Sequence, residues 1–365
     1  MRSLLAFIFL TGLSSTVVAQ SNIKESSNSF ARYTKTGEVK NLESAKNFID
    51  AAYKTKRDTV ATRNNIMRAL IYSSLAFADS TRKIKTPKDP IIIAKAALTK
   101  IKPKELGNYD SEVKYINQNL SAAYIYKANQ HIAKKEFDQA YTNFLEVEKL
   151  GINSIDVLNN LALLAKQAGK TDDAIGYYDR IIKTTDADVT KHLVLAELYK
   201  TKNNEQLYLN TLQDARQKFP NDKNVAFLLL QVFVESKSYA AASPLLDDVV
   251  KNDPNNTEIL YLAGFVSENV GNIPAAKKYY EKTLEIETNN FDANLALGLI
   301  YLNQFLGEKS NLEAQYSAQN YLLSANGIKP YSLNTLKGLA LFYEASEDLE
   351  QLDRVNILLN QLSNN

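Results

Sequence analysis

The sequence predicts an all-α fold in which pairs of antiparallel helices recur along the chain. The first observation is that Pro220 and Pro254 lie 34 residues apart. The second is that a series of mostly small residues keeps this spacing: Ala128, Ala162, Ala196, Leu230, Gly264 and Gly298. The third is that a series of larger residues repeats with it: Phe144, Tyr178, Leu212, Leu246 and Tyr280.

These two series fit together physically. Two helices approach closely only where one presents Ala or Gly, and a large residue of the other fills the space beside it. In the clearest unit, residues 155–188, we expect Ala162 on the first helix and Tyr178 on the second. Gly169 is expected to end the first helix, and Thr171 or Asp172 to cap the second.

A period of 34 with these residue types resembles the tetratricopeptide repeat (TPR), a helix–turn–helix unit. The resemblance implies a right-handed α-solenoid of TPR repeats whose task is to hold a partner. Five regular units are expected over residues 121–290. Because Ala318, Leu322 and Ala325 are displaced by about eight residues, residues 291–332 are expected to carry an insertion between their helices, around Gly307 to Gln315.

The ends of the repeat array are less regular. Residues 31–120 are expected to form atypical hairpins with a basic insertion, and residues 333–365 a last unit with a capping helix. Residues 20–30 are polar and predict a flexible segment leading into the array.

The N-terminus has the pattern of an export signal. Arg2 is followed by an apolar run from Leu4 to Leu13 and by small residues up to Ala19. Residues 1–19 are therefore predicted to be a signal peptide cleaved after Ala19, and the protein to be periplasmic or secreted. An uncleaved anchor is the alternative. The apolar run is too short for a transmembrane span, and no later one is expected.

The chain has no cysteine, which excludes disulfides and an acylated lipoprotein cysteine. Its charge is uneven: residues 31–110 carry 17 Lys and Arg against 8 Asp and Glu, whereas the chain from residue 201 carries 13 against 20. One interpretation is a basic surface for an acidic partner, anionic lipid or glycan phosphate. The other is a solvated, lysine-rich helix face. The basic residues are Arg82, Lys83, Lys85, Lys88, Lys95, Lys100, Lys102 and Lys104.

No motif for chemistry is present. The two histidines, His131 and His192, stand in no metal-binding spacing, and their repeat positions predict packing roles. No nucleophile elbow, P-loop or dinucleotide fingerprint occurs. We therefore predict no catalytic residue, cofactor or metal, and no nucleic-acid binding, because no aromatic residues interleave the basic run.

The resemblance to TPR proteins also points to a binding surface. In that family the concave face is lined by particular positions of the first helix of each unit. Three neighbouring units place large apolar residues at these positions: Phe227, Tyr261, Phe265, Leu295 and Leu299. We expect this set to bind a peptide segment or helix. The alternative is that superhelical curvature or the insertion near residue 310 covers it.

Two classes of function follow. The first is a non-enzymatic scaffold or adaptor in the cell envelope, similar to exported TPR proteins of Gram-negative bacteria, that binds another protein. The second is a glycan- or polysaccharide-associated protein of an uptake or export system. In that case some of the 21 tyrosines would replace the missing tryptophan as sugar-stacking side chains.

Overall fold

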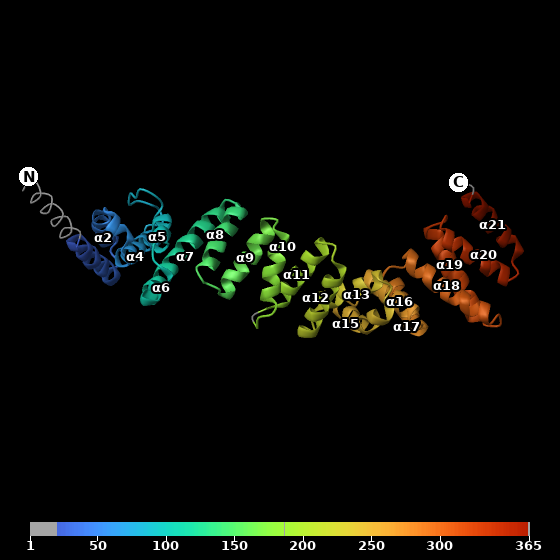
Figure 1. Ribbon diagram of the computed structural model, residues 1–365. Coiled ribbons are helices and arrows are strands. Elements are labelled where there is room, and N and C mark those ends of the chain that lie inside the picture. The colour runs from blue at the N-terminus through green and yellow to red at the C-terminus, as the bar shows by residue number, and fades with distance from the viewer. Residues whose placement is uncertain (1–19, 186, 364–365) are drawn as a thin grey trace, which may run out of the picture. The chain divides into compact units, whose positions relative to one another are not determined.

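The computed structural model describes residues 20–185 and 187–363, and within them every regular element is helical (Figure 1). The predicted all-α fold is confirmed. The predicted signal peptide, residues 1–19, lies outside the described residues. The chain divides into two compact units, residues 1–187 and 188–365.

The first unit stacks four helix pairs. After a helix over residues 20–36, the elements are α2 (Val39–Ala52), α3 (Lys56–Val60), α4 (Thr62–Ala78), α5 (Pro90–Leu98), α6 (Pro103–Leu106), η1 (Gly107–Tyr109), α7 (Asp110–Ala133), α8 (Phe137–Lys149), α9 (Ile155–Gln167) and α10 (Thr171–Ile181). The pairs are the helix over 20–36 with α2, then α4 with α5, α7 with α8, and α9 with α10.

The prediction that residues 20–30 form a flexible segment is wrong. These residues form the first part of the helix over 20–36. Phe30 and Tyr33 are one helical turn apart and are buried in the core of the unit, and the Ser26 hydroxyl donates to the Ala45 carbonyl of α2. The sequence suggested a flexible segment because residues 20–30 contain few apolar residues, but Phe30 and Tyr33 lie on one face of the helix and pack it against the core.

The hairpins before α8 depart from the regular repeat in two further places. Residues 79–89 form the expected insertion, where the Asp79 carboxylate accepts the backbone N–H groups of Lys83 and Ile84 at 2.9 and 2.7 Å. Helix α7 begins at residue 110, ahead of the expected 121. Its added turns bury Ile116 and Leu120 in the core shared with α4.

The second unit stacks five helix pairs. Its elements are α11 (Val189–Thr201), α12 (Glu205–Lys218), α13 (Lys223–Glu235), α14 (Tyr239–Ala242), η2 (Ser243–Leu245), α15 (Leu246–Asn252), α16 (Thr257–Asn269), α17 (Ile273–Ile286), α18 (Phe291–Gly307), α19 (Leu312–Ile328), α20 (Leu333–Ala345) and α21 (Leu349–Ser363). The segment α14–η2–α15 serves as one second helix. Its tighter turn lies at Pro244, which has no backbone N–H to donate.

Polar caps fix where the first helices from α9 onward begin. Each cap side chain accepts a backbone N–H of the first turn, which satisfies a donor that the helix leaves unpaired. From α9 to α18 these caps recur every 34 residues, and the cap of α20 follows after a longer interval. The caps are Ser154, Asp188, Asp222, Asn256, Asn290 and Ser332.

The turn inside each regular hairpin contains one residue with left-handed backbone. These residues also recur every 34 positions, with φ between 54° and 79°: Lys135, Gly169, Asn203, Lys237 and Gly271. The helix stop predicted at Gly169 is therefore confirmed. The predicted cap at Thr171 or Asp172 is wrong, because Lys170 is the N-cap of α10 and its side chain makes no cap hydrogen bond.

Lys237 is held in a conformation that costs a non-glycine residue about 1 kcal/mol. We expect Lys237→Gly to raise the free energy of unfolding by about 1 kcal/mol, and with it the melting temperature, because glycine adopts this φ without a Cβ clash. Lys237→Ala is the matched control, since alanine keeps the Cβ. Thermal melts followed by circular dichroism check this; equal melting temperatures for the two variants would contradict it.

The expected insertion between α18 and α19 takes a different form. Helix α18 has 17 residues against 13 in α16, and α19 has 17 against 14 in α17. Most of the eight extra residues therefore lengthen the two helices instead of forming a loop. Phe305, in the added turn of α18, is buried and lies 5.9 Å from the Phe342 ring of α20, which explains why this turn is helical.

Candidate functional site

The five residues predicted to bind a partner lie on three consecutive first helices of the second unit. Phe227 is on α13, Tyr261 and Phe265 are on α16, and Leu295 and Leu299 are on α18. All five side chains are partly buried. We call this set the apolar stripe.

Aromatic contacts hold the middle of the apolar stripe in place. The Tyr261 ring stacks on Phe265, with centroids 6.5 Å apart and planes 23° apart, and lies 5.5 Å from Tyr280 of α17. Phe265 meets the edge of Tyr239, from α14, at 5.7 Å. Tyr239 extends the stripe, and sequence reasoning missed it because it belongs to a second helix.

The stripe also has a candidate extension on α20. Leu341 follows Leu299 by 42 residues, one repeat plus the eight extra residues, and is 49% exposed. Allowing for the displaced register would have identified it from the sequence. The partial burial of the stripe is explained by neighbouring hairpins, since Tyr239, Tyr280 and the two core clusters of this unit pack against it. Its role in binding stays a prediction.

Carboxylates flank the apolar stripe. Glu258 and Asp292 are exposed, and Glu268 accepts a hydrogen bond of 2.9 Å from the Tyr280 hydroxyl. Burial raises the pKa of Tyr261, and the negative charges of Asp292 and Glu268 raise it further. Both carboxylates therefore act on the centre of the stripe, one from α18 and one from α16.

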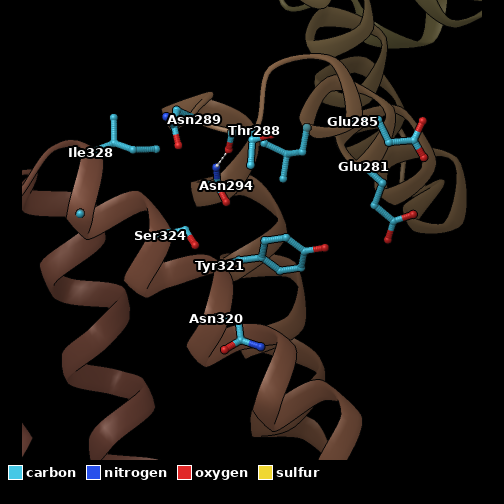
Figure 2. A pocket seen from close by; sticks show the side chains of 11 residues that line it. Glu281, Glu285, Thr288, Asn289, Asn294, Asn320, Tyr321, Ser324 and Ile328 are labelled. Atoms are coloured by element: carbon cyan, nitrogen blue, oxygen red, sulfur yellow. Dashed lines mark hydrogen bonds between the residues drawn. The ribbon is translucent and has the colours of Figure 1, made fainter.

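A second candidate site is an open hollow of about 900 Å³ in the same unit. Figure 2 shows the side chains that line it, which come from α17, from the turn before α18, from α18 and from α19. The Tyr321 side chain extends from α19 toward the helix that carries Glu281 and Glu285 (Figure 2). The lining residues are Glu281, Leu284, Glu285, Thr288, Asn289, Asn294, Asn320, Tyr321, Ser324, Gly327 and Ile328.

Tyr321 is part of an aromatic stack. Its ring lies 5.9 Å from that of Tyr301 with planes only 14° apart, and the Lys277 ammonium is 3.9 Å from the centre of the Tyr301 ring. Burial raises the pKa of Tyr321, as do the nearby Glu281 carboxylate and Tyr301. Sequence reasoning missed the hollow, since its residues come from four segments whose spacing depends on the lengthened hairpin.

Polar groups of the hollow are available to a ligand. Within the described residues, the side chains of Glu285, Asn289, Asn320 and Ser324 make no hydrogen bond or ion pair. Asn294 differs, because its amide donates to the Thr288 carbonyl at 3.1 Å and stiffens the turn (Figure 2). Amide, hydroxyl and carboxylate groups beside a tyrosine ring offer both donors and acceptors.

The basic residues of the first unit are only partly available. Lys95 pairs with Glu146, and hydrogen bonds from Lys149 and Lys95 lower the pKa of the Glu146 carboxyl to about 2. Arg82 lies 3.6 Å from Asp89. The exposed remainder is Lys83, Lys85, Lys88, Lys100, Lys102 and Lys104. Neither interpretation of this charge is decided.

The two histidines make local contacts. His192 is fully buried, where its ring nitrogens lie 3.1 Å from the Asp188 carbonyl and 3.1 Å from the Asp214 carboxylate. His131 contacts Glu136 at 2.6 Å. Residues 20–185 and 187–363 contain no cluster of three or more His, Asp or Glu arranged to hold a metal ion. In the same residues, no helix is long and apolar enough to cross a membrane.

The stacked helix pairs and the 34-residue spacing of their caps and turns define a helical-repeat fold of TPR type. No protein-family model matches the chain. ER membrane protein complex subunit 2-A of Xenopus laevis is 21% identical to it over 133 residues. That match covers 34% of this chain and 43% of the relative, less than half of the relative's length.

Solved structures with similar helical repeats include MamA and YrrB. The MamA crystal structure is 19% identical, with a TM-score of 0.38, and the match covers 47% of this chain and 93% of MamA. YrrB, described as a TPR protein with an unusual peptide-binding site, is 18% identical with a TM-score of 0.38. That match covers 49% of this chain and 94% of YrrB. The helix pairs of this chain and their 34-residue spacing identify the fold independently of these matches.

Proposed function

We propose that this protein is a non-enzymatic scaffold that binds a segment of another protein along the apolar stripe. The observation that carries the proposal is the row of five partly buried apolar side chains at equivalent positions of three consecutive first helices. Stacked hairpins present such positions side by side, so an elongated segment can contact several helices at once.

The scaffold is proposed to act in the cell envelope of a Gram-negative bacterium. Support comes from the pattern of residues 1–19, a positive start, an apolar run and a small-residue cleavage motif. Mass spectrometry of the chain purified from its native host is expected to find Gln20 at the N-terminus. A chain that retains Met1 and stays in the cytoplasmic fraction would contradict this location.

Site-specific cross-linking tests the scaffold function. A photo-reactive phenylalanine analogue replaces Gln231, which is partly buried at a stripe position of α13, or Glu313, which is exposed on α19. Illumination in envelope extract is expected to join one defined protein to the chain from position 231 and not from 313. The same products from both positions would show that capture does not depend on the stripe.

The hollow beside Tyr321 favours a second candidate function, binding of a glycan. Four of its polar side chains, those of Glu285, Asn289, Asn320 and Ser324, make no hydrogen bond or ion pair within the described residues and line the same hollow as a tyrosine ring. Sugars present hydroxyl groups together with apolar C–H faces. The ring is already stacked on Tyr301, so its orientation is fixed before a ligand arrives. Absence of tryptophan does not argue against this site, since a tyrosine provides the stacking surface.

Tyr321→Ala tests the glycan function. The variant is expected to bind oligosaccharide at least about fivefold more weakly, because stacking of this kind contributes about 1 kcal/mol beyond burial. Tyr316→Ala is the matched control, because Tyr316 is 63% exposed on the same helix and outside the hollow. Screening on a glycan array and then calorimetry measure this. A wild-type chain that binds no glycan, or equal weakening by both variants, rules the candidate out.

A further inference from the structure

Two of the three first helices that carry the apolar stripe, α16 and α18, are acidic on the same face. On α16, Glu258, Tyr261, Phe265 and Glu268 follow one another at spacings of 3, 4 and 3 residues. Residues three and four apart share one face of a helix. The stripe residues of α16 therefore have a carboxylate one turn before them and another one turn after them.

Helix α18 repeats the first part of this pattern. Asp292, Leu295 and Leu299 are spaced by 3 and 4 residues. Neither α16 nor α18 contains a lysine or arginine. The two helices that contribute four of the five stripe residues therefore have negative charge and no positive charge of their own.

These carboxylates lack cationic partners in the described residues. Some other acidic side chains of the second unit are paired, among them Asp248 with Arg216, Asp214 with Lys218, and Glu350 with Arg354. Glu258 and Asp292 are exposed and form no ion pair with any described residue. Glu268 accepts its one hydrogen bond from a neutral tyrosine hydroxyl.

We propose that the apolar stripe, if it is the partner site proposed above, binds a cationic amphipathic segment of another protein. Apolar side chains of that segment lie on Tyr261, Phe265, Leu295 and Leu299. Its lysine or arginine residues, one helical turn away, meet Glu258, Asp292 and Glu268. The aromatic rings add to the attraction, since a ring face beside a carboxylate favours a cation.

The rim position of Glu258 and Asp292 sets the expected energetics. Exposed charges at the edge of an interface mainly raise the association rate and make it depend on salt. Contacts with the apolar stripe are then the main reason why the bound segment dissociates slowly. The chain from position 201 has 13 basic against 20 acidic residues, and this net negative charge adds long-range attraction for a cationic segment.

The test uses the whole chain and three labelled model peptides of helical periodicity. One contains leucine and lysine, one has glutamate in place of lysine, and one has glutamine there. Fluorescence anisotropy is expected to show the lysine peptide binding about tenfold more tightly than the glutamine peptide, and the glutamate peptide binding most weakly. Raising the salt concentration is expected to remove most of this difference.

Two charge-neutralising variants separate local from general attraction. Glu258→Gln with Asp292→Asn is expected to weaken lysine-peptide binding about tenfold, mostly through slower association. Glu313→Gln with Asp353→Asn is the matched control, since it removes the same charge from exposed positions on the second helices α19 and α21. Its effect is expected to stay below about twofold.

The outcomes distinguish this inference from the function on which it rests. Equal binding of lysine and glutamine peptides, together with loss of both in Phe265→Ser with Leu299→Ser, overturns the charge preference and supports the stripe. Equal weakening by the two neutralising variants also overturns it. Lysine-peptide binding that is unchanged in Phe265→Ser with Leu299→Ser shows that the stripe is not the site, and the proposed function fails with it.

Discussion

Replacing Phe265 and Leu299 together by serine is expected to abolish partner capture, with affinity falling roughly a hundredfold or more. Each is an apolar anchor on its own helix, and such central anchors carry about 2 kcal/mol or more of binding each. Serine removes the apolar surface and leaves a hydroxyl that cannot fill the same contact. Cross-linking from position 231 and peptide anisotropy measure the loss.

This variant also loses packing within the chain. Phe265 contacts Tyr239 and Tyr261, and Leu299 packs against the core of the last hairpins. Some destabilisation is therefore expected, and it must be measured by thermal melting alongside binding. A variant that unfolds at the binding temperature would show that these two residues serve the core and that the site lies elsewhere.

The matched control is Leu228→Ser with Leu262→Ser. Both leucines are partly buried on α13 and α16, each one residue after a stripe position, which places them about 100° around the helix. This control is expected to lose comparable stability and to keep capturing the partner. If both double variants fold and bind alike, the exposed lysines of residues 83–104 become the better candidate surface.

The regular part of the fold was predictable because each repeat shows the same pattern of small residues, large residues and helix-capping residues. Position 162 or 264 needs a small residue, the residue that faces it is large, and each first helix from α9 onward begins after a Ser, Asp or Asn cap. These requirements act within about 20 residues of chain. A period of 34 therefore locates helices without knowledge of any long-range contact.

The irregular parts were less predictable for a physical reason. An insertion of eight residues is visible as a displaced register, but the sequence alone does not say whether it loops out or extends both helices. Burial of Phe305 against Phe342 decides this, and that contact lies between hairpins. The helix over 20–36 was missed in the same way, since its docking depends on contacts with α2 and α7.

The two candidate sites differ in the same way, because one follows from the local repeat pattern and the other depends on contacts between hairpins. The apolar stripe follows from the repeat register, so its five residues were identified from the sequence. The hollow around Tyr321 depends on how far the lengthened α19 lies from α17, and no local pattern encodes that distance. The flanking carboxylates were visible in the sequence, but their lack of cationic partners required the structure.

Replacing Gly264 by leucine is expected to destabilise the second unit by about 3 kcal/mol, the upper end of the usual cost of overpacking. A Cβ at this position would lie 2.5 and 2.6 Å from two carbons of the Tyr280 ring. That ring is fully buried and is hydrogen-bonded to Glu268, so it has no free direction in which to move. Alanine occupies this position at 128, 162 and 196, leucine at 230 and glycine at 298; at position 264 the Tyr280 ring leaves room only for glycine.

Gly264→Ala separates the two opposing effects. Alanine favours a helix by about 1 kcal/mol over glycine, but here the Cβ clash offsets or exceeds that gain. Gly176→Ala is the matched control, because Gly176 lies within α10 with nothing within 4 Å of its Cβ position, and it is expected to stabilise by up to about 1 kcal/mol. Thermal and urea unfolding measure all three variants. A Gly264→Ala chain that gains as much stability as Gly176→Ala would show that the hairpin of α16 and α17 is not closed on Tyr280.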